Sequence, residues 1–80
     1  MTDHDLDEND LAVVRKLVAM VGEIEGKGGV GVPLEQRLFA ALALNRVDWL
    51  TEQHYSIGQA LQRIGPEWAA YLPEVARRLQ

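Results

Sequence analysis

The sequence predicts an all-α protein, a single small domain of four to five short helices around one core. Apolar residues recur three and four positions apart along most of the chain, which is the period of an amphipathic helix. Helix start and stop signals flank these segments, and no segment alternates with a period of two over more than a few residues. The length of 80 residues and the 48% hydrophobic content fit one domain, which we expect over residues 8–80.

The first expected helix covers residues 8–25. Asp7 can cap the free N–H groups at its start, Asp10 can return that bond, and Leu6 can pack on Leu11 as a hydrophobic staple. One apolar stripe runs along the helix and consists of Leu11, Val14, Leu17, Val18, Val21 and Ile24.

Residues 26–32 are expected to form a glycine-rich hinge loop, because four of the six residues 26–31 are glycines, which disfavour helix and strand interiors. The stretch 27–31 resembles the opening of the deviant Walker A loop of the chromosome-partitioning and septum-site ATPases. That family continues with a lysine and a threonine or serine that contact phosphate and magnesium, whereas Val32 and Pro33 follow here. We therefore interpret the segment as a hinge and expect no nucleotide.

The second helix is expected to begin at Pro33, whose fixed φ suits the first helical position. Asn45 can end it and cap a short third helix over 46–53. The residues of these two helices that we expect to face inward are Leu34, Leu38, Phe39, Ala41, Leu42, Val47, Trp49 and Leu50.

Two more helices follow. Ser56 and Gln59 form a capping box for the fourth, and Gly65 stops it. Pro66 begins the last helix, which Pro73 is expected to kink or divide because proline has no N–H to bond back to residue 69. The expected core consists of Leu17, Val21, Leu38, Leu42, Leu50, Leu61 and Ile64.

Acidic residues are concentrated at the start of the chain, where residues 1–7 are predicted to be a flexible acidic leader. The net charge is −4, and the first ten residues hold five carboxylates and no basic group: Asp3, Asp5, Asp7, Glu8 and Asp10. One interpretation is a solvated helix entry, because negative charge suits a helix N-terminus. The other interpretation is that these carboxylates attract a basic surface on a partner.

Several function classes are disfavoured. With no cysteine and only two histidines, the chain lacks the usual ligands of a zinc site. The spacing of the aspartates in the leader does not complete the calcium-binding loop of an EF-hand, because Glu8 occupies the position that needs glycine and Val14 the position that needs the bidentate glutamate. Ser56 is the only serine and serves as a cap. We expect no enzyme, no cofactor and no metal, and a cytoplasmic protein without a membrane span.

The pattern over residues 56–79 predicts a helix, a turn and a second helix, so a small homodimeric DNA-binding regulator is the alternative hypothesis. Pro73 interrupts the second of these helices, and a pI near 5.0 supplies no concentrated basic face for phosphates. Direct nucleic-acid binding is therefore disfavoured.

Binding to another protein, or to a second copy of the chain, is the leading hypothesis. Tyrosine, tryptophan and arginine dominate the energy of protein interfaces. The candidate contact residues are Asp3, Asp5, Asp7, Glu8, Asp10, Tyr55, Trp68, Tyr71, Arg77 and Arg78. In size, acidity and lack of cysteine the chain resembles small inhibitors encoded by phages and plasmids, including anti-CRISPR proteins. That profile implies a stoichiometric inhibitor or accessory subunit that occludes a partner surface.

Overall fold

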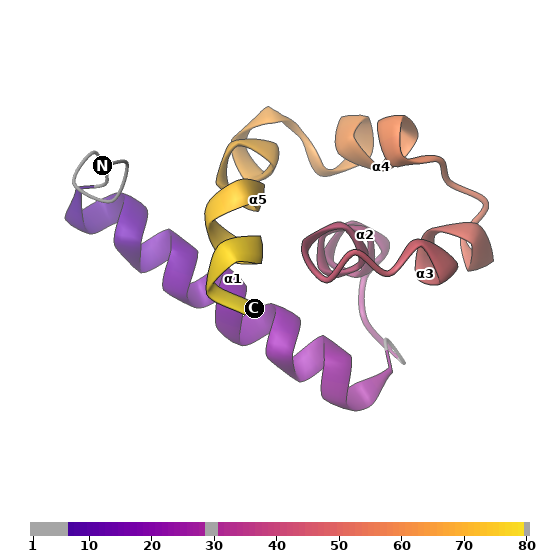
Figure 1. The fold of residues 1–80 in the computed structure, drawn as a ribbon, viewed down its shortest axis with the longest axis horizontal. Coiled ribbons are helices and arrows are strands. Elements are labelled where there is room, and N and C mark those ends of the chain that lie inside the picture. Colours follow the sequence, from indigo (N-terminus) through magenta and orange to yellow (C-terminus); the bar gives the residue numbers. More distant parts are fainter. Residues whose placement is uncertain (1–6, 29–30, 80) are drawn as a thin grey trace.

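Five α-helices and no strand form the part of the chain that this computed structural model describes, which is residues 7–28 and 31–79 (Figure 1). The helices are α1 (Glu8–Lys27), α2 (Leu34–Ala43), α3 (Val47–Glu52), α4 (Ile57–Ile64) and α5 (Pro66–Leu79). This confirms the predicted all-α fold. Within the described residues, none of these helices is both long and apolar enough to cross a bilayer.

Helix α2 occupies the centre of the fold and packs against each of the other four helices. In Figure 1 it is seen end-on, with α5, α4 and α3 around it and the long α1 below. Its sequence is almost entirely apolar after the first turn, so it can bury side chains on several sides. The buried core consists of Val14, Leu17, Val21, Ile24, Leu38, Phe39, Ala40, Ala41, Ala43, Leu50, Ala60, Ile64 and Val75.

Helix α1 starts as predicted and ends later than predicted. Asp7 is its N-cap, and Asp7 Oδ1 accepts a hydrogen bond of 2.8 Å from the Asp10 backbone N–H. The helix continues through Lys27, so Gly26 belongs to α1 and not to the loop. Gly28 ends it with a φ of 69°, a left-handed conformation that glycine adopts without strain, and its N–H bonds to the Ile24 carbonyl.

One detail of that helix start differs from the sequence prediction, and another falls on a residue that the structure does not describe. The Asp10 carboxylate does not return the capping bond, and its Oδ1 instead accepts a hydrogen bond from the Tyr71 hydroxyl. The expected staple between Leu6 and Leu11 involves a residue outside the described part of the chain.

In the middle of the chain, Asn45 ends α2 as predicted but does not cap α3. The Asn45 N–H bonds to the Leu42 carbonyl at 3.2 Å and the Arg46 N–H bonds to the Ala41 carbonyl at 2.8 Å, which closes the C-terminus of α2. Asn45 has a φ of 57°, and Arg46 takes the N-cap position of α3 in its place. A left-handed conformation suits a residue just past the end of a helix, and asparagine tolerates it, whereas an N-cap residue has a negative φ, as Arg46 does at −97°. Ser56 and Gln59 form the predicted capping box, with hydrogen bonds of 3.1 Å and 2.9 Å.

The helix boundaries at prolines were predicted with partial success. Pro33 is the N-cap of α2 and not its first helical residue, so the helix begins at Leu34, one residue later than predicted. Pro66 begins α5, directly after Gly65, whose φ of 91° ends α4. Pro73 does not divide α5, which runs without interruption to Leu79. An exposed position accommodates the proline ring, although the bond to residue 69 is lost.

Five of the seven predicted core residues are buried, but Leu42 is only half-buried and Leu61 is exposed. Helix α4 buries Ala60 and Ile64, so its inward stripe is narrower than the apolar stripe of the sequence. Val47, also expected to face inward, is 51% exposed at the start of the short α3. Periodicity identified the apolar sides of these helices correctly, but neighbouring helices cover only part of each side.

Candidate functional site

The first turn of α1 and the first half of α5 meet, although they come from opposite ends of the chain. The Tyr71 hydroxyl donates a hydrogen bond of 2.7 Å to Asp10 Oδ1. Asp10 lies at the third position of α1, and Tyr71 lies in the second turn of α5. Both side chains are half-buried, so this bond connects two candidate contact residues at the molecular surface.

Trp68 lies one turn before Tyr71 and contributes a half-buried indole to the same region. Its ring packs edge-on against Phe39, with the ring centroids 5.4 Å apart and the planes at 73°. Phe39 is fully buried in α2, so the core fixes the position of the indole. Trp68 and Tyr71 line an open depression of about 430 Å³ between α1 and α5, together with Val13, Glu67 and Ala70.

Carboxylates surround the phenol of Tyr71. The hydrogen bond to Asp10 raises the pKa of Tyr71 above its ordinary value, and partial burial and the charges of Asp10, Asp7 and Glu67 raise this pKa further. These residues define one surface, which we call the acidic–aromatic face: Asp7, Asp10, Glu67, Trp68 and Tyr71. Glu67 was not among the residues predicted from the sequence, although its place next to Trp68 was a usable signal.

The remaining acidic candidates lie at or before the start of α1. Glu8 is exposed in the first turn of the helix. Asp3 and Asp5 lie outside the described residues.

The two C-terminal arginines are not part of this face. Arg77 and Arg78 lie in the last turn of α5, where both hydrogen bond to Oε2 of Glu74. The bond from Arg77 and the bond from Arg78 hold the pKa of Glu74 below its ordinary value. The arginines therefore form a separate ion-pair cluster with a carboxylate of their own helix.

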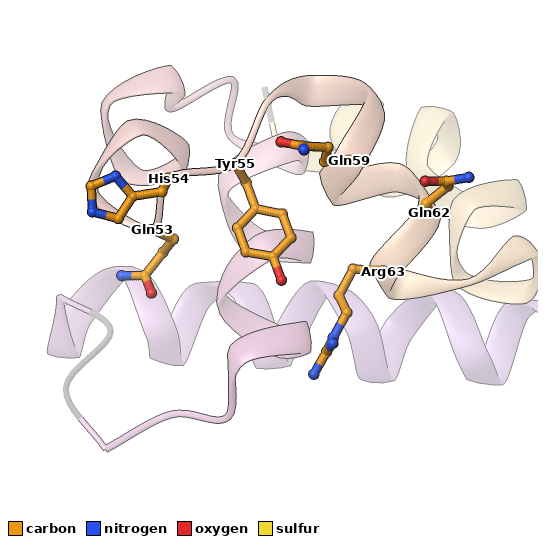
Figure 2. Close-up of a pocket in the computed structure, with 6 residues that line it drawn as sticks. All are labelled: Gln53, His54, Tyr55, Gln59, Gln62 and Arg63. Carbon is orange, nitrogen blue, oxygen red and sulfur yellow. The ribbon is translucent and has the colours of Figure 1, made fainter.

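Tyr55 lies at a second depression, on the side of the molecule formed by α3 and α4 (Figure 2). This depression is open, measures about 580 Å³, and is lined by Gln53, His54, Tyr55, Gln59, Gln62 and Arg63. Figure 2 shows the phenol directed into the space between the two helices, towards Arg63. Arg63 itself pairs with Glu35 at 3.1 Å. The three glutamines can donate and accept hydrogen bonds, and sequence reasoning did not single out their grouping as a surface.

A third polar arrangement surrounds Trp49 in α3. The guanidinium carbon of Arg46 lies 4.7 Å from the centroid of the Trp49 ring, a cation–π contact. Asp48 accepts hydrogen bonds of 3.1 Å and 3.0 Å from Arg46. These bonds raise the pKa of Arg46 and lower the pKa of Asp48. This contact was not predicted from the sequence, although an arginine three residues before a tryptophan, at the start of an expected helix, was a usable signal.

The geometry of α4 and α5 bears on the DNA-binding alternative. Only Gly65 separates the two helices, whereas a helix-turn-helix motif has a turn of about three to four residues. Both arginines of α5 also hydrogen bond to Glu74. No feature of this pair of helices specifically favours DNA binding, and the alternative stays a prediction.

Comparison of the chain with protein-family models, curated proteins and solved structures finds no match. Within residues 7–28 and 31–79, no three His, Asp or Glu side chains gather in an arrangement that could hold a metal ion. A function for this chain therefore has to be argued from the chemistry of its surface.

Proposed function

We propose that this protein is a non-catalytic binding module that occupies a basic surface of another protein with its acidic–aromatic face. In this role it is a small acidic stoichiometric inhibitor or accessory subunit, of the anti-defence type that phages and mobile elements encode. The observation that carries the proposal is the contact between Asp10 and Tyr71 beside Trp68, which gathers predicted contact residues from both ends of the chain.

The chemistry of this face suits protein recognition. Half-buried aromatic rings can become desolvated anchors, and such anchors account for most of the binding energy at interfaces. Surrounding carboxylates favour a basic partner and speed the encounter between the two surfaces. The edge-on packing of Trp68 on Phe39 supports the proposal further, because a ring already held in place loses little freedom on binding.

The size of the molecule is consistent with action by occlusion. A protein–protein interface of standard size buries about 800 Å² on each partner. That area is roughly a seventh of the 5287 Å² accessible surface of this chain. One bound copy can therefore cover a functional surface of a larger protein while remaining folded on its own core.

Co-purification tests the proposal first. A tagged copy is recovered from its host cells, and the captured material is analysed by mass spectrometry and for nucleic acid. We expect a protein with a basic surface, bound in a fixed ratio. Recovery of DNA without such a protein contradicts the proposal and supports the helix-turn-helix alternative.

The captured partner then allows a kinetic test of the acidic residues. Asp3, Asp5 and Glu8 are neutralised to Asn, Asn and Gln in one variant, which leaves the Asp7 cap intact. We expect association several-fold slower at low salt, and we expect the difference to shrink at physiological salt, where the Debye length is about 8 Å.

The matched control removes the same number of charges elsewhere, as Glu23→Gln, Glu25→Gln and Glu52→Gln. These side chains are exposed at the far end of α1 and on α3. An association rate that both triple variants reduce equally reflects net charge alone and contradicts a steering role for the acidic residues at the start of the chain. Tyr71→Ala is expected to speed dissociation, with little dependence on salt.

A further inference from the structure

The depression between α1 and α5 combines two aromatic side chains with negative charge. Glu67 is the charged residue among its described lining residues, which include neither lysine nor arginine. Asp10 lies at its edge through the bond to Tyr71, and that bond occupies Oδ1 and not Oδ2. Aromatic rings attract cations to their faces, and carboxylates accept hydrogen bonds from cationic donors. The lining is therefore complementary to a positively charged side chain.

The same molecule contains an internal example of such a contact. At α3, the guanidinium of Arg46 lies over the Trp49 ring while Asp48 accepts two hydrogen bonds from it. A tryptophan and a neighbouring carboxylate thus hold one arginine from two directions. Glu67 and Trp68 repeat this pairing of a carboxylate with a tryptophan at the depression, with Asp10 and Tyr71 beside them.

We propose that the depression lined by Val13, Glu67, Trp68 and Tyr71 binds the guanidinium of an arginine side chain that the partner protein presents. The proposal deepens the proposed function and rests on it for the source of the arginine. Arginine fits better than lysine, because a planar guanidinium can stack on an indole and donate to carboxylates at the same time. The specificity of the face then comes from one inserted side chain, and the surrounding carboxylates guide the approach.

A short peptide tests this site without the partner. The probe is acetyl-Gly-Arg-Gly-amide, titrated into the full chain while the indole N–H signals of both tryptophans are followed by NMR. We expect a saturable shift at Trp68 and at the backbone amides of residues 67–71. Trp49 serves as the internal reference, because Arg46 already covers its ring. The citrulline version of the peptide has the same shape without the charge, and we expect it to leave Trp68 unshifted.

Two matched variants separate a specific site from general attraction to an acidic protein. Glu67→Gln is expected to weaken binding of the arginine peptide at least threefold. Glu23→Gln removes the same charge about 15 Å further along α1 from Val13 and is expected to leave the affinity unchanged. Equal shifts with the citrulline peptide, no saturable shift at Trp68, or equal weakening by both variants would overturn the inference.

The two proposals fail in distinguishable ways. If the arginine peptide binds as expected and no partner protein co-purifies, the site stands and the proposed function is contradicted. If a basic partner is captured through the acidic–aromatic face and the peptide leaves Trp68 unshifted, the proposed function stands and the arginine site is wrong.

Discussion

The hydroxyl of Tyr71 reports on the contact between the two ends of the chain, because its hydrogen bond to Asp10 requires the protonated phenol. The pKa of Tyr71 is raised in the folded protein above the ordinary 10.0, first by this bond. A group with a raised folded pKa stabilises the fold below its unfolded pKa, and this contribution is lost as pH rises through the folded pKa. Stability should therefore decline above about pH 10.

We expect Asp10→Asn to lower the pKa of Tyr71, because the negative charge disappears. The measurement is the tyrosinate absorbance as a function of pH, recorded for the parent chain and for the Asp10→Asn variant. Subtracting the absorbance of the same protein with Tyr71→Phe leaves the titration of Tyr71 alone. Urea unfolding of the Tyr71→Phe variant should show a smaller loss of stability above about pH 10 than the parent chain. A Tyr71 pKa that Asp10→Asn leaves unchanged would show that the bond is absent in solution.

Phe39 and Leu61 provide a matched pair for the core, because both are large apolar residues with opposite environments. Phe39 is fully buried and Leu61 is 37% exposed. Phe39→Ala should reduce the free energy of unfolding by about 3–5 kcal/mol, which leaves a domain of this size largely unfolded. Leu61→Ala should reduce it by less than about 1 kcal/mol.

Urea denaturation followed by circular dichroism measures both effects. Phe39→Leu retains much of the side-chain volume and keeps the comparison measurable if the alanine variant does not fold. A Leu61→Ala loss as large as that of the Phe39 variant would contradict the observed orientation of α4.

At the scale of the helices, two glycines have opposite roles. A Cβ added at either Gly22 or Gly65 would meet no atom within 4 Å, so any difference between them comes from the backbone. Gly65 has a φ of 91° and a ψ of 161°, a region open essentially to glycine alone, and Gly65→Ala should cost about 1–3 kcal/mol. Gly22 lies inside α1, where Gly22→Ala should add about 0.5–1 kcal/mol of stability.

Thermal and urea unfolding of the two single variants measure this difference. Gly58→Ala is a second helical control, since Gly58 also lies inside a helix and a Cβ added there would meet no atom within 4 Å. Stabilisation by Gly65→Ala would show that the connection between α4 and α5 has a different backbone in solution.

For the whole molecule, the central place of α2 predicts where the backbone opens last. Each of the other four helices packs against α2, so exposing its amides requires most of the core to open. Hydrogen exchange should be slowest in the second half of α2, where Leu38 to Ala41 are buried, and faster in the first turn of α1. Equal protection at these two places would contradict a core organised around α2.

The sequence predicted the local structure well because caps and turns depend on residues a few positions apart. Asp7 caps α1 by accepting a hydrogen bond from the backbone amide of Asp10. At the start of α4, the side chains of Ser56 and Gln59 each accept a hydrogen bond from the backbone N–H of the other. Gly65 ends α4 because its φ of 91° lies outside the helical range. Asn45 was predicted correctly as the end of α2, where its N–H bonds to the Leu42 carbonyl, and wrongly as the cap of α3. Its left-handed conformation closes α2, and the N-cap of α3 is therefore the next residue, Arg46.

The candidate site was predicted only in part, since residue type indicates which side chains suit an interface and not which of them meet. Asp10 and Tyr71 were both singled out, yet their contact spans 61 positions of the chain. Tyr55 lies at the other depression, and Arg77 and Arg78 pair with Glu74.

By itself, therefore, the sequence determined the all-α class, through the helical spacing of its apolar residues. It also determined the helix starts at Asp7 and Ser56 and the end of α4 at Gly65, since short-range hydrogen bonds and backbone preferences decide each of these. Only the tertiary structure decided that Phe39 is buried and Leu61 exposed, and that Asp10 meets Tyr71 beside Trp68. These outcomes depend on how the helices pack around α2, because packing between distant segments selects which part of each apolar stripe is covered.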